Sequence, residues 1–307
     1  MNKQLLLSEF LTTPWALMPE RLQAMSGILT RWSAGEPPSE ETLFQVNTDR
    51  VLRDSRKQMA AASAGSGIAV LPLYGVVTQR GNMVDDISGP GSTSTQQFAA
   101  VLRQMLADDT VGQILIDIDS PGGSVYGVAE LASEIVKARA QKPVIAVANS
   151  LAASAAYWLG CSASELYVTP GGEVGSIGVW QAHFDYSKAL EEDGVKPTLI
   201  SAGKFKVEGN PYVPLDEQAQ AFMQSRVDDY YNAFVEAVAI GRGVSVNDVR
   251  TGMGEGRVLG ADAAMAQNMV DGIASFDDVL AKMQANIRST PVRSSRLKQA
   301  RDALALM

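Results

Sequence analysis

Cysteine and histidine each occur only once in this chain of 307 residues, as Cys161 and His183. A single cysteine excludes an intrachain disulfide bond and fits a reducing compartment. A single histidine leaves one candidate base for a triad of serine, histidine and aspartate. His183 lies in WQAHFDYS, where apolar and polar residues alternate as in a strand, so a structural role is its simpler interpretation.

Long hydrophobic runs are also missing. No stretch approaches the roughly 20 apolar residues that cross a bilayer. Glu9 and Pro14 interrupt the leucine-containing start before the core of a signal peptide is complete. We therefore expect no membrane partner and a location in the cytoplasm.

Positive charge is in the minority, with 26 Lys and Arg against 34 Asp and Glu and a net charge of −8. Such a chain is a poor ligand for a phosphate backbone, so we expect no nucleic-acid partner. No residues have metal-ligand spacing, and the glycine-rich GMGEGRVLG at 252–260 matches neither a dinucleotide fingerprint nor a P-loop. We expect a turn there, and neither a metal nor another cofactor.

The composition divides the chain into four parts. Residues 1–55 have apolar residues at helical spacing and predict a loosely attached helical extension. The small and polar residues of 56–67 predict a flexible linker. Residues 68–286 hold the apolar core patterns, and basic residues prevail in 287–307, which indicates a mobile tail.

Between 68 and 286, apolar strand patterns alternate with amphipathic helix patterns. The strands IAVLPLYGVV, VGQILIDID and PVIAVAN are nearly continuous in apolar residues, and the helix STQQFAAVLRQMLADD has a serine or threonine cap. This order predicts an α/β fold with a largely parallel sheet covered by helices. We also expect a strand at TLISAG. A long helix from Leu215 to Gly241 has an apolar face larger than one domain needs, which favours a homo-oligomer.

Two loops could carry chemistry on their backbone and hydroxyl groups. DSPGGSV at 119–125 places Gly122 and Gly123 between a strand and a helix, where exposed N–H groups can form an oxyanion hole or simply a tight turn. Ser154 lies at the start of a helix in the alanine-rich NSLAASAAYWLG. It is either a nucleophile or a serine packed in a crowded core.

A third region could supply the base. GSIGV contains Ser176, and SAGKFKVEGNPY contains Lys204 and Lys206, which are ordinary surface lysines in the simplest interpretation. A neutral lysine can activate a serine, but a lysine with its usual pKa near 10.4 must first be desolvated. The small apolar residues around Ser154 would provide such surroundings.

In this order, the motifs DSPGG, AASAAYW, GSIGV and GKFKVEGNPY resemble the signal peptide peptidase A family of Ser-Lys proteases, and in particular its phage branch of head-maturation proteases. The resemblance covers about residues 68–275. It implies a Clp/crotonase-type α/β fold of repeated strand-strand-helix units. It also implies an endopeptidase that acts on protein or peptide substrates.

The resemblance also assigns roles to individual residues. It implies that Ser154 is the nucleophile, Lys206 the general base, Ser176 the serine that hydrogen-bonds the lysine, and the N–H groups of Gly123 and Ala155 the oxyanion hole. The family has glycines after the nucleophile where this chain has alanines, which limits how closely a substrate can approach.

The lysine assignment has a second argument. Lys206 lies between Phe205 and Val207, so we expect it to be desolvated, whereas Lys204 follows Gly203 and is expected to be solvated and to help bind substrate.

The implied setting is phage assembly. The partners would be further copies of the chain and the phage portal, scaffold and capsid proteins, in the bacterial host cytoplasm or inside the procapsid. Two alternatives share the fold. One is an acyl-CoA enzyme of the crotonase type, and the other is a non-catalytic capsid or scaffold component with an idle site.

Overall fold

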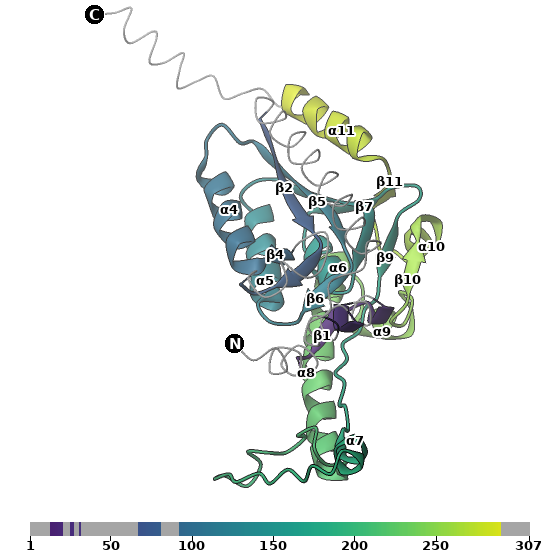
Figure 1. Cartoon of the computed structure of the whole chain (residues 1–307). Helices are drawn as coiled ribbons and strands as arrows, with labels where there is room; N and C mark the ends of the chain where they lie inside the picture. The colour runs from purple at the N-terminus through teal and green to yellow at the C-terminus, as the bar shows by residue number, and fades with distance from the viewer. Residues whose placement is uncertain (1–12, 21–24, 28–30, 32–66, 81–91, 290–307) are drawn as a thin grey trace, which may run out of the picture.

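The central sheet of the protein is largely parallel. The computed structural model describes residues 13–20, 25–27, 31, 67–80 and 92–289 (Figure 1). The strand order is β10-β9-β7-β5-β2, with β8 paired to both β7 and β11. Among the strands that the structure describes in this sheet, the β9–β10 pair is antiparallel and the others are parallel. The bounds are β2 Ile68–Tyr74, β5 Gln113–Ser120, β7 Val144–Ala153, β8 Glu165–Val168, β9 Glu173–Gly175, β10 Val258–Gly260 and β11 Gly272–Ile273.

A smaller sheet has the order β1-β6-β3-β4. Its strands are β1 Trp15–Leu17, β3 Val76–Thr78, β4 Ser92–Ser94 and β6 Gly122–Ser124. The chain passes from β2 through Gly75 into β3, and from β5 through Pro121 into β6. Two long strands of the central sheet therefore continue directly into strands of the smaller sheet. The first pair is followed by β4 and then α4, and the second directly by α5, which agrees with the repeated strand-strand-helix arrangement of a Clp/crotonase-type fold.

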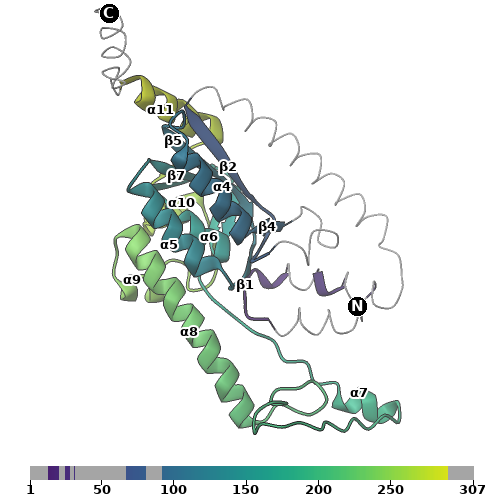
Figure 2. The same cartoon turned by 90° about the vertical axis from the view of Figure 1, so that its left-hand side faces the viewer.

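Helices cover both faces of the central sheet (Figure 2). Because side chains alternate along a strand, Ile114, Ile116 and Ile118 of β5 join one core cluster and Leu115 joins the other. The first cluster lies beneath α4, α5 and α6, and the second beneath α11. The bounds are α4 Thr95–Ala107, α5 Val128–Arg139, α6 Ala155–Gly160, α9 Val246–Thr251, α10 Ala261–Ala266 and α11 Phe276–Ser289.

A long arm projects from this body. Residues 181–216, here called the arm, contain α7 Ser187–Glu192 and lead into α8 Glu217–Arg242. Figures 1 and 2 show α7 at the end of α8 that is remote from the sheets. The buried apolar residues in the second half of α8, such as Phe234 and Val238, anchor that half in the core.

The structure corrects three expectations. Trp15–Leu17 is a buried strand rather than part of a loose helix, because its backbone pairs with β6. TLISAG forms no strand and Ile200 is 95% exposed, because the arm holds this segment away from the sheets. Ile287 is the half-buried continuation of α11 rather than the start of a tail.

The expected linker and most of the expected extension and tail lie outside the described residues. Within the described part of the chain, no helix is both long and apolar enough to span a bilayer.

Candidate active site

Ser154 occupies a strained turn between β7 and α6. Its backbone angles are φ 54° and ψ −120°, in a region that residues with a side chain rarely adopt. The residue is 1% exposed, and among the described residues its Oγ has no hydrogen-bond partner. A strained strand-to-helix turn with an unsatisfied buried hydroxyl is costly for stability and typical of a nucleophilic serine.

The structure brings Ser176 beside this turn. Ala153 and Gly175 are paired in register on β7 and β9, and the Ser154 N–H donates to the Gly175 carbonyl oxygen at 2.7 Å. Ser154 and Ser176 are the next residues along the two strands, so they lie side by side. It is half-buried and also has a φ of 54°, and its N–H donates to the Arg257 carbonyl oxygen at 2.8 Å.

The two glycines of β6 line the same place. A Cβ on Gly122, whose φ is 98°, would lie 2.9 Å from the Cβ of Ser154, and a Cβ on Gly123 would collide with the backbone of Val77. Only glycine therefore lets β6 lie between Ser154 and β3. Ala155 is the first residue of α6, so its N–H has no acceptor within that helix. The structure thus groups the predicted backbone donors around the serine.

The predicted lysine lies elsewhere in the chain. Lys206 belongs to a turn of the arm, where its N–H donates to the Gly203 carbonyl oxygen at 3.2 Å, and the residue is exposed. Lys204 is exposed as well, with its Nζ 4.7 Å from the ring centre of Phe205. The expected extended segment and the expected desolvation by Phe205 are therefore wrong for a single chain. Both lysines belong to the arm, which projects from the body that holds Ser154 (Figure 2).

Residues 136–289 match the family model of peptidase family S49. The chain belongs to this family. It is 36% identical over 248 residues to capsid assembly protease C of Escherichia phage lambda, covering 81% of this chain and 55% of that protein. It is 34% identical over 267 residues to head-tail preconnector protein GP5 of Enterobacteria phage P21, covering 85% and 52%.

A cellular relative is similar over a comparable stretch. The identity to putative signal peptide peptidase SppA of Enterococcus faecium is 26% over 237 residues, covering 77% of this chain and 68% of that protein. The chain spans about half the length of the two phage proteins. The predicted resemblance to this family and to its phage branch is confirmed.

In this S49 chain, α8 packs against α6, the helix that follows Ser154. The ring of Trp158 in α6 stacks on Phe234 of α8 with centroids 4.7 Å apart. A Cβ on Gly241 would collide with the carbonyl oxygen of Cys161, so the two helices touch through backbone there. Cys161 is buried, which raises the pKa of its thiol to about 12 and leaves it a neutral packing residue.

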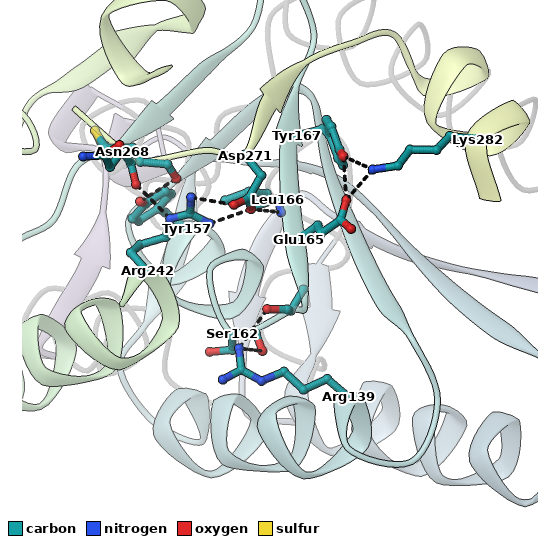
Figure 3. A network of polar contacts seen from close by, with 12 residues as sticks. Arg139, Tyr157, Ser162, Glu165, Leu166, Tyr167, Arg242, Asn268, Asp271 and Lys282 are labelled. Carbon is teal, nitrogen blue, oxygen red and sulfur yellow. Dashed lines mark hydrogen bonds and ion pairs between the residues drawn. The ribbon is translucent and has the colours of Figure 1, made fainter. Parts of the chain in front are cut away.

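A polar network behind α6 was not predicted from the sequence (Figure 3). Arg242, at the end of α8, donates to Asp271 Oδ2 at 2.7 Å, and Asp271 accepts the Leu166 N–H at the same distance. Burial alone would raise the pKa of Asp271, but these hydrogen bonds outweigh it and lower the pKa. The Tyr157 hydroxyl donates to the Met269 carbonyl oxygen at 2.9 Å. The network fixes α6 and α8 to the sheet edge.

Neither His183 nor a metal site contributes to the surroundings of Ser154 in the part of the chain that the structure describes. His183 lies in the arm without strand structure, with its Nε2 3.1 Å from the Asn210 carbonyl oxygen, so it joins two passages of the arm rather than facing Ser154. Among the described residues, no group of three His, Cys, Asp or Glu side chains could hold a metal ion.

Proposed function

We propose that this chain is a serine endopeptidase in which Ser154 is the nucleophile and Lys206 of a second copy is the general base. The observation that carries the proposal is the buried Ser154 hydroxyl, which has no hydrogen-bond partner among the described residues and lies on a strained turn beside the glycines of β6. Family membership supports peptidase chemistry at this turn.

The surface of the arm supports a base from another copy. Large apolar side chains are exposed along the arm and at the start of α8, which is typical of a surface that a partner covers. They are Phe184, Tyr186, Val195, Leu199, Ile200, Phe205, Tyr212, Val213 and Phe222. A second copy is the partner that would also supply the base that Ser154 lacks, because Lys204 and Lys206 lie in the arm, which projects from the body of the same chain (Figure 2). A head-to-tail contact of this kind forms a ring when the rotation between successive copies closes, and we propose a ring.

The proposed reaction has two halves. Lys206, neutral after desolvation in the contact between copies, takes the proton of Ser154, whose Oγ attacks the peptide carbonyl carbon. The N–H groups of Gly123 and Ala155 stabilise the oxyanion. The lysine then protonates the leaving amine, and a water molecule activated by the same lysine releases the acyl group. Ser176, beside Ser154, orients the lysine by a hydrogen bond.

The proposed substrates are proteins of phage assembly. This follows from what the two phage relatives are called, a capsid assembly protease and a head-tail preconnector protein. We propose that scaffold or capsid-associated proteins are cut in the host cytoplasm or the procapsid. We also propose that the protease domain, expected at residues 68–286, extends to the end of α11 at Ser289.

Cleavage of unfolded casein tests the assignment of the nucleophile. Ser154→Ala should lower the rate at least about 10³-fold with an unchanged circular dichroism spectrum. Ser162→Ala is the matched control, because Ser162 is also buried but its hydroxyl already donates to the Trp158 carbonyl oxygen. Loss of activity in both variants, or in neither, would contradict the proposal.

A further inference from the structure

The strand β1 lies beside the glycines of the candidate active site. Residues Trp15–Leu17 pair antiparallel with β6, with Trp15 opposite Ser124, Ala16 opposite Gly123 and Leu17 opposite Gly122. All three residues of β1 are buried. Addition of an extended strand to a sheet edge is a common way in which proteins bind peptides.

The other edge of β1 forms hydrogen bonds with Trp180. The Trp15 N–H donates to the Trp180 carbonyl oxygen at 2.9 Å, and the Trp180 N–H donates back to the Trp15 carbonyl oxygen at 3.0 Å. The indole Nε1 of Trp180 donates to the Leu17 carbonyl oxygen at 2.9 Å. The strand therefore lies between β6 and the segment that follows Ser176, as a bound peptide would.

The register of β1 sets the Ala16 carbonyl group opposite Gly123. The Met18 N–H donates to the Pro121 carbonyl oxygen at 3.2 Å, and the Val125 N–H donates to the Pro14 carbonyl oxygen at 3.4 Å. Hydrogen-bonded pairs alternate along an antiparallel ladder, so the pair between these two, Ala16 with Gly123, is also in hydrogen-bonding register.

The close packing at Gly122 agrees with this register. A Cβ built on Gly122 would collide with the Ala16 carbonyl oxygen and lie 2.9 Å from the Ser154 Cβ. The Ala16 carbonyl oxygen and the Ser154 Cβ therefore both lie close to Gly122, and the register directs the Gly123 N–H, a proposed oxyanion donor, to Ala16.

We propose that the peptide bond between Ala16 and Leu17 is a cleavage site of this chain, cut by its own Ser154; this rests on the proposed function. The Ser154 Oγ forms a bond to the Ala16 carbonyl carbon, and the bond from that carbon to the Leu17 nitrogen breaks. The serine proton passes through the base to the Leu17 amine. Water then hydrolyses the ester, which leaves a carboxylate on Ala16 and restores Ser154.

The same geometry indicates which substrates fit. Ala16 is 0% exposed and belongs to the main core cluster, so a small side chain is required before the cut bond. Until it is cut, β1 occupies the place of any other substrate. We therefore expect cleavage of an added protein to begin after a lag.

Intact mass and N-terminal sequencing of wild type and Ser154→Ala test this inference. We expect a wild-type chain that begins at Leu17, and a Ser154→Ala chain that keeps this bond. In the same preparations, unfolded casein reports the peptidase activity independently. A synthetic peptide of residues 13–20, TPWALMPE, should be cut between Ala and Leu at least about 10-fold faster than a scrambled peptide of the same composition.

The outcomes separate this inference from the proposed function. Casein cleaved in a Ser154-dependent manner, with the Ala16–Leu17 bond intact in chain and peptide, would overturn the inference and leave the proposed function standing. Cleavage of the chain only at other bonds, with Ala16–Leu17 intact, would overturn it too. Casein left intact by the wild type would contradict the proposed function, and this inference with it.

Discussion

The backbone N–H of Ser154 donates to the carbonyl oxygen of Gly175 at 2.7 Å. This bond joins the ends of the parallel strands β7 and β9, and the residues that follow, Ser154 and Ser176, both have a φ of 54°. Two strained serines thus stand next to each other at one edge of the sheet. Such strain persists only where the surrounding structure enforces it, and it is typical of functional sites.

Ser176 should act as a positioning residue for the base. We expect Ser176→Ala to lower kcat about 10- to 100-fold, less than the 10²- to 10⁴-fold effect of a positioned general base. The rate profile should also move to higher pH, because the Ser176 hydroxyl can donate a hydrogen bond to the nitrogen lone pair that only the neutral lysine has, and the variant loses this bond. A lower kcat with an unchanged pH profile would indicate a structural role only.

The two lysines of the arm should differ in effect. Lys206→Ala is expected to lower the peptidase rate at least about 10²-fold, and Lys204→Ala far less. The wild-type rate should rise with pH towards an apparent pKa below about 10.4, because the base acts in its neutral form and desolvation favours that form. Rates of both variants on one peptide substrate decide this. An active Lys206→Ala with an inactive Lys204→Ala would reverse the assignment.

Gly122 should not tolerate a side chain. Gly122→Ala places a methyl group against the Ser154 Cβ at a φ of 98°, so we expect loss of activity and a cost of about 1–3 kcal/mol in unfolding free energy. Gly171→Ala is the control, because no atom lies within 4 Å of its added Cβ. Thermal unfolding and casein cleavage measure both effects. A fully active Gly122→Ala would mean that β6 does not approach Ser154 as described.

The Arg242–Asp271 pair should make stability depend on acid pH. The pKa of Asp271 is lowered in the folded chain, so the pair stabilises above the unfolded pKa near 3.9, and this contribution is lost as the pH falls through the folded value. At pH 7, Asp271→Asn should lower the unfolding free energy by about 1 kcal/mol, since the carboxylate is partly exposed. The difference from wild type should shrink towards pH 3. A difference that is constant with pH would contradict this.

The central α/β unit could be predicted from the sequence because its signals are local. Continuous apolar strands, a cap such as Ser94, and the motifs around Gly123 and Ser154 each depend on residues close together in the chain. Parallel strands then bring Ser154 and Ser176 to one edge. The strands, the cap and the motifs could therefore be predicted because each of these signals lies within a short stretch of sequence.

Two features could not be predicted in this way. The strand Trp15–Leu17 has three residues, too few to show a period, and its partner β6 lies more than 100 positions along the chain. The position of Lys206 depends on the direction in which the arm projects from the sheets (Figure 2). Spacing within GKFKVEGNPY says nothing about that direction, because tertiary and intermolecular contacts decide it.

The central claim is that serine and lysine meet between two copies, and complementation between variants tests it most directly. Ser154→Ala and Lys206→Ala are co-expressed with different tags, mixed assemblies are isolated through both tags, and casein cleavage is compared with each variant alone. Each variant alone should be inactive. Mixed assemblies should regain about a quarter of the wild-type activity, because in a head-to-tail ring one contact in four then joins an intact serine to an intact lysine. Mixed assemblies as inactive as either variant alone would contradict the account.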